Sequence, residues 1–505
     1  MKNTFNLIYC NYINHKNLKY KLLFYLNPTS KITQLKIYFT LFIFFGFTAC
    51  KKLVTIPLPV NSITTSSVFS TDAQANTALA GIYANLIEKP SFADGYSTFY
   101  LGMSADELLY FYGSQGLNQY QFNTNAILSS NGDLLNYFWT QPYFSIYQAN
   151  ATIAGLAAST GVDQQTKNEL TGEALFVRAY CYFYLTNLFG DVPLVLTTDY
   201  NKTSLLARTP STQVYQQIIN DLKTAQNLLE TDYSYSIAEG ERIIPNKWAA
   251  TALLARAYLY IGDYPNAYIQ SNAVIENSGE YSLVPNLAGV FNTNSTEAIW
   301  QLKQNLQATT ANITYDGDFF IPANSNRNPT YYIASGLINS FEVGDKRRTV
   351  WIDSTNYFGM VYYIPYKYTL GPAQSSHVGT ITQYYMMLRL AEQYLIKAEA
   401  EANNAGPGIS AAVNDLNSIR TRAGLPNYSG ALDKTSLMNA IMHERQVEFF
   451  CEQGHRWLDL KRWGNAASEL SQSKGISVTT NSLLYPIPMS EITTDPKLTQ
   501  NKGYQ

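Results

Sequence analysis

Apolar residues recur at helical spacing in several stretches of the chain. Over residues 71–87, Ala78, Ile82 and Leu86 fall on one face of a helix. Residues 138–158 show the same period. Both stretches are therefore predicted to form amphipathic helices that bury one face against neighbouring elements.

One short motif occurs twice, each time within an Ala- and Leu-rich helical pattern. Residues 178–182 read Arg-Ala-Tyr-Cys-Tyr and residues 256–260 read Arg-Ala-Tyr-Leu-Tyr, and a Gly-Asp pair follows each copy. The second copy matches the tetratricopeptide pattern, in which Ala255 allows close helix approach, Tyr258 fills the groove and Gly262 turns the chain. The repeat therefore predicts helical hairpins.

A third helical unit is predicted over residues 388–424, where a Gly-Pro-Gly turn at 406–408 separates two periodic stretches. Residues 221–229 are predicted to pair with the first copy of the motif. Three or four hairpins stacked side by side would bury one continuous core. The predicted fold class is mainly α: tetratricopeptide-like helical hairpins forming a superhelical scaffold, with long irregular loop excursions and a few short strands.

Two long stretches interrupt the helical pattern. Residues 95–125 and 304–378 are rich in Gly, Asn and Tyr and lack helical periodicity, and short strand-like runs lie at 298–302 and 360–366. Loops this long are uncommon unless they are functional, so ligand contacts are expected there. The candidate ligand-binding side chains are Tyr96, Tyr100, Tyr110, Tyr112, Tyr315, Tyr331, Tyr332 and Trp351. Ordinary packing is the alternative role for each of them.

A segment near the N-terminus is typical of a bacterial lipoprotein signal. Lys31 and Lys36 precede an apolar stretch over 37–47, and small residues then lead to Cys50. The apolar stretch is too short to span a bilayer comfortably. We therefore expect residues 1–49 to be a leader, with translation starting nearer Lys31, and Cys50 to carry the lipid. A plain signal peptide or a short membrane anchor is the alternative.

The composition limits the classes of function. The 505 residues carry a net charge of -2, which argues against a nucleic-acid binder held by bulk electrostatics. Charged residues make up 14% of the chain, aromatic residues also make up 14%, and 40 residues are Tyr. Such a surface suits an extracellular protein that handles neutral polar ligands. Cys181 and Cys451, outside the leader, are predicted to be small buried side chains rather than a disulfide framework.

The residues over 443–464, HERQVEFFCEQGHRWLDLKRWG, combine many charges with aromatic side chains. Glu444, Glu448 and Glu452 are spaced to share one helix face, where alone they would repel one another. The cations predicted to neutralise them are Arg445, Arg456, Lys461 and Arg462. The interleaved aromatics indicate partial burial, and buried charges must be paired. The segment is therefore predicted to lock the fold rather than to catalyse.

Residues that carry chemistry are scarce. The chain has no phosphate-binding loop and no dinucleotide fingerprint, and His443-Glu444 lacks the second ligand of a zinc motif. No catalytic residue, metal or cofactor is therefore expected. The acid pairs nearest to aromatic loops, Asp106-Glu107 and Asp316 with Asp318, are hydrolase candidates, with solvated loop charges as the alternative. Arg347 and Arg348 are interpreted as a solvated basic turn, or else as contacts for an acidic glycan.

The charged segment resembles the C-terminal signature of the SusD/RagB family, the outer-membrane nutrient-binding lipoproteins of Bacteroidetes. The matching residues are Glu444, Arg445, Glu448, Glu452, Gly454, Arg456, Trp457, Asp459, Leu460, Arg462 and Trp463. The last residues, 484–504, resemble the family's closing motif, although Asp495 and Lys502 stand where Asn and Pro are usual. Residues 178–194 resemble its N-terminal half.

The resemblance implies one SusD-like domain over 50–505, with an N-terminal half over 50–240 and a C-terminal half over 241–505. Family members are lipid-anchored at the outer membrane, face outward, and present oligosaccharides to a SusC-like TonB-dependent transporter without cutting them. The chain is therefore expected to be a non-enzymatic surface lipoprotein with an oligosaccharide ligand and that transporter as its partner. A binder of peptides or other non-sugar nutrients is the first alternative, followed by a structural scaffold and a hydrolase.

Overall fold

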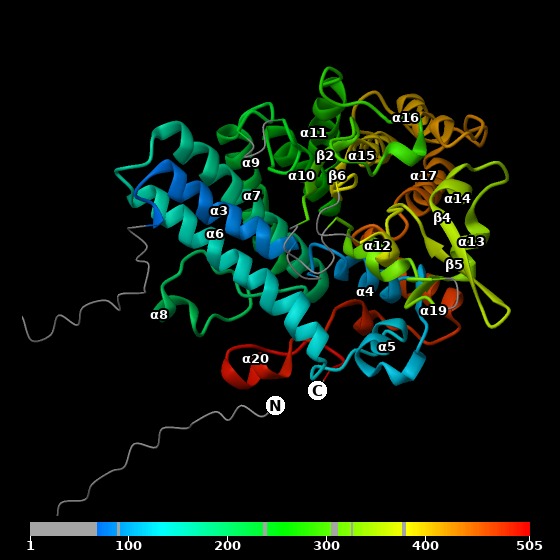
Figure 1. The fold of residues 1–505 in the computed structure, drawn as a ribbon, viewed down its shortest axis with the longest axis horizontal. Coiled ribbons are helices and arrows are strands. Elements are labelled where there is room, and N and C mark those ends of the chain that lie inside the picture. Colours follow the sequence, from blue (N-terminus) through cyan, green and yellow to red (C-terminus); the bar gives the residue numbers. More distant parts are fainter. Residues whose placement is uncertain are drawn as a thin grey trace, which may run out of the picture. The chain divides into compact units, whose positions relative to one another are not determined.

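The two copies of the repeated motif lie in long helices (Figure 1). The first is part of α7 (Gln164–Phe189) and the second ends α10 (Lys247–Tyr260). The Asn246 side chain caps α10 by accepting hydrogen bonds from two backbone N–H groups of its first turn. Gly262, at φ 74°, turns the chain into α11 (Tyr264–Glu276). The predicted helix–turn–helix unit is confirmed.

The computed structural model describes residues 68–87, 91–235, 240–304, 312–324, 327–375 and 380–504. The predicted leader and Cys50 lie outside these residues. The described residues belong to one unit that begins at Thr64. Their other helices of seven or more residues are α3 (Asp72–Ile87), α4 (Tyr96–Ser104), α5 (Leu117–Asn123), η4 (Leu134–Thr140), α6 (Gln141–Ala158), α9 (Ser211–Leu228), α15 (Leu390–Ala402), α16 (Ile409–Arg422), α17 (Lys434–Glu448), α18 (His455–Trp463) and α19 (Ala466–Lys474).

Shorter helices connect these elements within the described residues. The short α-helices are α8 (Tyr200–Thr203), α12 (Tyr315–Phe320), α13 (Ser335–Ser340), α14 (Arg347–Val350) and α20 (Met489–Thr494). The 3₁₀ turns are η3 (Gly113–Gln115), η5 (Leu287–Gly289), η6 (Pro372–Gln374) and η7 (Thr480–Leu483). Several of them lie in the two excursions, so these stretches are irregular but not without helix.

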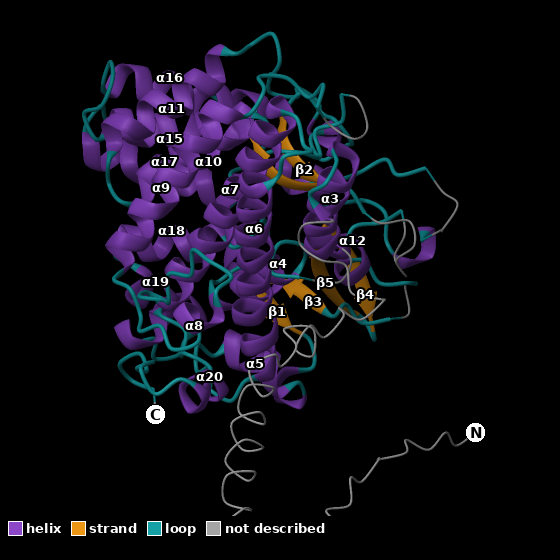
Figure 2. Cartoon of the chain, turned by 90° about the vertical axis from the view of Figure 1, so that its left-hand side faces the viewer, coloured by secondary structure: helices purple, strands orange, loops and turns teal. Residues whose placement is uncertain are grey.

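Successive long helices pack side by side into a curved array (Figures 1 and 2). Helix α7 lies between α6 and α9, α10 lies between α9 and α11, and α15 packs on both α11 and α16. The predicted pairing of 221–229 with the first motif is confirmed, because α9 packs along α7. The array is the predicted superhelical scaffold of tetratricopeptide-like hairpins.

The strands form three separate two-stranded antiparallel sheets. Strand β1 (Leu108–Tyr110) pairs with β3 (Tyr331–Ile333), and β2 (Ala298–Leu302) pairs with β6 (Tyr385–Arg389). Strand β4 (Ile352–Tyr357) pairs with β5 (Met360–Pro365) as a hairpin. Strands β2 and β6 are buried along their whole length, so they belong to the core.

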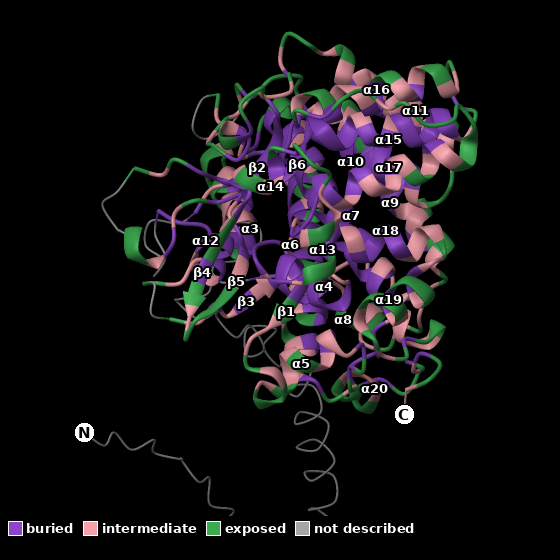
Figure 3. Ribbon diagram, turned by 90° about the vertical axis from the view of Figure 1, so that its right-hand side faces the viewer, coloured by how far each residue is buried: buried purple, intermediate pink, exposed green. Residues whose placement is uncertain are grey.

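Figure 3 shows how far burial extends through the helical array. Helix α4 is buried at every position from its second residue onward, and α7 is buried on nearly every side. A helix buried all round carries no polar–apolar period. This explains why α4 was not predicted and why 95–125 was expected to lack helices. Cys181 and Cys451 are free and buried, as predicted.

Candidate ligand-binding surface

The two loop excursions meet in the small β1–β3 sheet. Leu109 lies opposite Tyr332, and Tyr110 lies opposite Tyr331. Strand β5 packs beside β3, where the rings of Tyr332 and Tyr362 are 5.1 Å apart. Residues more than two hundred positions apart in the sequence therefore share one surface.

Seven aromatic side chains with partly or largely exposed rings form a connected group here, which we call the aromatic surface. Its members are Tyr110, Phe111, Tyr112, Tyr332, Tyr357, Phe358 and Tyr362. The ring of Phe111 makes edge-to-face contacts with Tyr112, Tyr357 and Tyr362 at centroid distances of 5.4, 5.7 and 5.5 Å. Such contacts fix the rings relative to one another. Tyr112 remains 44% exposed.

The tip of the β4–β5 hairpin presents one of these rings to solvent. Tyr357 pairs with Met360, so Phe358 and Gly359 form a two-residue turn in which both φ angles are positive, 50° and 81°. This is the geometry of a type I′ turn, which Asn-Gly fills best. The Asn356 side chain accepts the Gly359 N–H at 3.0 Å and stabilises the turn. Phe358 is 90% exposed, so a strained position carries an exposed ring.

The structure brings only some of the predicted ligand residues to this surface. Tyr110, Tyr112 and Tyr332 belong to it. Tyr96 is half-buried, and its ring centroid lies 3.9 Å from that of Tyr137. The buried residues among those predicted are Tyr100, Tyr315, Tyr331 and Trp351. Their rings are enclosed by packing, so the prediction of ligand contact is corrected for these four.

Trp351 shows why this correction is needed. Its side chain is 1% exposed, and its indole N–H donates to the backbone oxygen of Leu287 at 2.9 Å. The Lys367 ammonium lies 4.9 Å from the ring centroid, and two guanidinium groups, of Arg389 and Arg422, lie 5.9 and 5.8 Å away. Trp351 is therefore a core residue, although the sequence around it lacks helical periodicity.

The glutamates of the charged C-terminal segment lie in a buried ion-pair network. The partners of Glu448 are Arg347, Arg389 and Arg422. Arg347 also pairs with Glu444 at 2.6 Å. Burial alone would raise the pKa of Glu448, but the charges of the three arginines outweigh it and hold that pKa well below its usual value.

The cations that neutralise the glutamates come from outside the segment. Glu452 pairs with Arg389 at 2.8 Å and also with Lys367. The predicted cations have other partners: Arg445 pairs with Asp459, Arg456 with Asp106, Arg462 with Glu399 and Asp459, and Lys461 donates to the backbone oxygen of Asn187. The predicted pairing is wrong because α17 ends at Glu448 and the chain then reverses through Cys451 and Gln453, both at positive φ.

Two further basic residues also differ from expectation. Arg347 is fully buried in the network rather than part of a solvated turn. The Arg348 guanidinium lies 4.6 Å from the ring centroid of Tyr363. Trp457, a residue of the family signature, is fully buried and stacks on Tyr485 at 6.0 Å. These side chains serve the packing of the C-terminal half.

Among the candidate acids for hydrolysis, Glu107 and Asp316 are buried, while Asp106 and Asp318 are partly exposed. Burial pushes the pKa of Asp106 upward, but its hydrogen bonds and ion pair with Arg456 outweigh this and keep the pKa below its usual value. Burial raises the pKa of Glu107 to about 8 and that of Asp316 well above its usual value. Both are at most 2% exposed, so a polysaccharide does not reach them in this structure.

Metal chemistry and membrane spanning find no support in the described part of the chain. Over those residues no group of three or more His, Cys, Asp or Glu side chains is arranged to hold a metal ion. A search of the same residues also finds no helix with the length and apolar content needed to cross a bilayer.

Two family models match the chain and together span both of its halves. The model for the SusD family matches residues 310–504. A second SusD-like model, described as starch-binding and associating with the outer membrane, matches residues 61–259. The chain belongs to the SusD family.

Relatives of this SusD-family chain agree with it over most of its length. SusD-like protein P2 of Formosa agariphila is 28% identical over 499 residues, which cover 88% of this chain and 95% of the relative. The solved surface glycan-binding protein A from Bacteroides uniformis superposes with a TM-score of 0.73 at 22% identity, over 85% of this chain and 99% of the other. A laminarin-binding SusD-like protein superposes with a TM-score of 0.71 at 22% identity, over 86% and 100%.

Proposed function

We propose that this SusD-family protein binds oligosaccharides on the aromatic surface. The observation that carries the proposal is the connected set of exposed rings, which strands from both excursions assemble. Apolar C–H faces of a sugar ring stack on aromatic faces, while hydroxyl and amide groups at the edges satisfy the sugar hydroxyls. Five of the seven rings are Tyr, which combines an apolar ring with a polar hydroxyl group.

Of the residues expected from the sequence, Tyr110, Tyr112 and Tyr332 are proposed as ligand contacts. The structure adds Phe358 and Tyr362, because both are on the same surface. Tyr96, half-buried against Tyr137, stays a prediction of ligand contact from the sequence. The relatives named for laminarin binding and surface glycan binding support a glycan as the ligand class.

The rest of the proposal concerns where the protein acts. We infer that the Cys50 thiol carries the lipid that anchors the chain to the outer membrane, facing outward. The bound oligosaccharide would be handed to a SusC-like TonB-dependent transporter without being cut. The family description of association with the outer membrane supports this location. The burial of Glu107 and Asp316 supports a binding role without hydrolysis.

Affinity electrophoresis of the fragment Lys51–Gln505 in gels that contain single polysaccharides tests this function. Retardation by one glycan, with no loss of its chain length, is expected. The Tyr112→Ala, Phe358→Ala double variant should weaken that retardation at least tenfold, because each stacked ring contributes about 1 kcal/mol or more. The control is Tyr200→Ala, which removes an exposed ring from α8, outside the aromatic surface.

Unchanged retardation of the double variant would refute the placement on the aromatic surface. Retardation by no glycan in the panel would refute the glycan class and favour peptide ligands. Shortening of the glycan during the experiment would show a hydrolase.

A further inference from the structure

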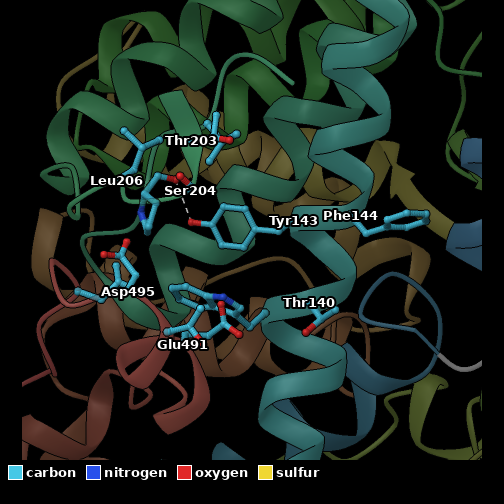
Figure 4. A pocket seen from close by; sticks show the side chains of 13 residues that line it. Thr140, Tyr143, Phe144, Thr203, Ser204, Leu206, Glu491 and Asp495 are labelled. Carbon is cyan, nitrogen blue, oxygen red and sulfur yellow. Dashed lines mark hydrogen bonds between the residues drawn. The ribbon is translucent and has the colours of Figure 1, made fainter. Parts of the chain in front are cut away.

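A separate cavity of about 430 Å³ lies where the start of α6, the 193–206 connection and the C-terminal helix α20 meet (Figure 4). This is within the size range of small-molecule sites. No member of the aromatic surface lines it. Trp139, which lines the cavity, belongs to the π-helix η4.

The walls of the cavity are apolar and aromatic. The rings come from Trp139, Tyr143 and Phe144. The Tyr143 hydroxyl donates to the backbone oxygen of Pro193 at 2.9 Å, so this hydroxyl is already engaged. In Figure 4 the Tyr143 ring reaches across toward Ser204, whereas the Phe144 ring points the opposite way and lies at the rim.

Two carboxylates give the cavity a negative charge. Glu491 on α20 and Asp495 just after it are four residues apart, and no Lys, Arg or His side chain lines the cavity. Asp495 is 8% exposed, and one of its oxygens accepts the backbone N–H of Lys497 at 2.9 Å. Within the described part of the chain, its other oxygen and the Glu491 carboxylate accept no hydrogen bond. Like charges at this spacing repel one another.

Arg208 does not cancel this charge, because its hydrogen bonds go to other groups. The charge of Arg208 acts on Tyr143, but the guanidinium donates to the backbone oxygens of Asp191 and Thr499, at 2.7 and 2.9 Å, and to Phe189 and Asn501. It therefore holds the chain around the end of α7.

We propose that this cavity binds an organic cation, namely a primary ammonium or guanidinium group on a short apolar stem. The positive group would lie between the two carboxylates and relieve their repulsion, as charge-assisted hydrogen bonds form to both. Aromatic walls add cation–π attraction, and the apolar lining takes the stem. A Lys or Arg side chain of a peptide and the amine of an amino sugar share this chemistry. The inference does not depend on glycan binding at the aromatic surface.

The first test compares 1-aminopentane with 1-pentanol by calorimetry on the Lys51–Gln505 fragment at pH 7 and low salt. The two probes have the same stem and differ in charge, so the amine should bind at least tenfold more tightly. The isosteric double variant Glu491→Gln, Asp495→Asn should lose at least tenfold in amine affinity and leave the alcohol unchanged. The control Glu276→Gln, which removes an exposed carboxylate from α11, should bind like the wild type.

Two further pairs of probes distinguish the natural source of the cation. Glucosamine is compared with glucose, and the tripeptide Gly-Lys-Gly with Gly-Gln-Gly, both at pH 6.5. Tighter binding of the charged member of either pair supports the proposal and names the source. The single variant Asp495→Asn, which restores the usual residue of the motif, keeps the test valid if the double variant does not fold.

Equal affinities for amine and alcohol would overturn the proposal, as would amine binding that both variants leave unchanged. The absence of measurable binding for every amine would also overturn it. Glycan binding is measured in a separate experiment, by electrophoresis. The Tyr112→Ala, Phe358→Ala double variant used there changes only the aromatic surface. A failure of glycan binding therefore leaves the cation site standing, and the reverse also holds.

Discussion

Two arrangements stabilise buried charged side chains in this protein. The charge has an oppositely charged partner, or it forms hydrogen bonds to several acceptors. Lys474 illustrates the second case, since its ammonium donates to three backbone oxygens and to the side chain of Asn125. Burial lowers its pKa to about 7. Glu107 has neither form of compensation in its charged state, because no ion-pair partner reaches it among the described residues. It therefore holds its proton well above the pH at which an exposed Glu ionises.

This raised pKa predicts a pH-dependent stability. The pKa of Glu107 is about 4.3 when unfolded and about 8 when folded. Between these values the folded state binds a proton that the unfolded state has released, so the contribution of Glu107 to stability is greatest below about pH 4 and falls as pH rises toward 8. Glu107→Gln should therefore gain stability relative to the wild type from pH 5 to pH 8, by on the order of 1 kcal/mol per pH unit.

Urea unfolding at pH 5, 6.5 and 8 measures this difference. Glu469→Gln, which removes an exposed carboxylate from α19, is the control and should follow the wild type at each pH. A constant difference between Glu107→Gln and the wild type across this range would show that Glu107 is ionised in the folded protein.

Helices of the array are joined by the arginines of the repeated motif. Arg178 on α7 pairs with Asp221 on α9 at 2.7 Å. Arg256 on α10 pairs with Glu392 on α15 through two hydrogen bonds of 2.6 Å. Arg178 therefore links two helices that pack side by side, whereas Arg256 reaches past α11 to α15, so both copies of the motif connect helices of the array.

Removal of one member of such a pair should be costly. Arg256→Met leaves the Glu392 carboxylate buried without a counter-charge, and we expect a loss of about 3–5 kcal/mol in the free energy of unfolding. The double variant Arg256→Met, Glu392→Met removes both charges and should recover most of that loss. Chemical denaturation of both variants measures the coupling between the two side chains.

The control is the exposed pair of Lys202 with Asp199, where the lysine side chain is 73% exposed. Lys202→Met should change stability by less than about 0.5 kcal/mol. If the double variant at Arg256 and Glu392 is as unstable as the single one, the helices are held by the shape of these side chains rather than by their charge.

The same elements show what could be predicted from the sequence. Hairpins such as α10–α11 were predictable because the period, the turn glycine and the cap are all local signals. The β1–β3 pairing was not, since strands of three residues carry no period and their partners are far apart in the sequence. The aromatic surface was therefore predicted only in part: Tyr112 was found, whereas Phe358 was missed because Phe-Gly lacks the Asn or Asp that usually marks a two-residue hairpin turn. Burial of Trp351 depends on cations from three separate elements.

At the scale of the whole molecule, the last residues of the chain connect the two halves through hydrogen bonds. The Tyr485 backbone N–H donates to the oxygen of Leu188 at 2.7 Å, and its hydroxyl bonds to Ser104 at 2.7 Å. The Asn501 side chain donates to the oxygens of Phe189 and Tyr485 at 2.9 and 2.7 Å. These oxygens include free carbonyls at the end of α7, which a helix leaves without partners. The halves over 50–240 and 241–505 are therefore not expected to fold independently.

This fastening predicts that a single side chain near the C-terminus affects the stability of the whole domain. Asn501→Ala removes both donors and leaves the buried Tyr485 oxygen without this partner, so the free energy of unfolding should fall by about 1–3 kcal/mol. Tryptophan fluorescence and circular dichroism should still report one coincident transition, because both halves unfold together. Lys497→Ala is the matched control, since it truncates an exposed side chain in the same segment and should leave stability unchanged within about 0.5 kcal/mol. Two separate transitions, or equal stability of the two variants, would show that the closing segment lies on the N-terminal half without holding it.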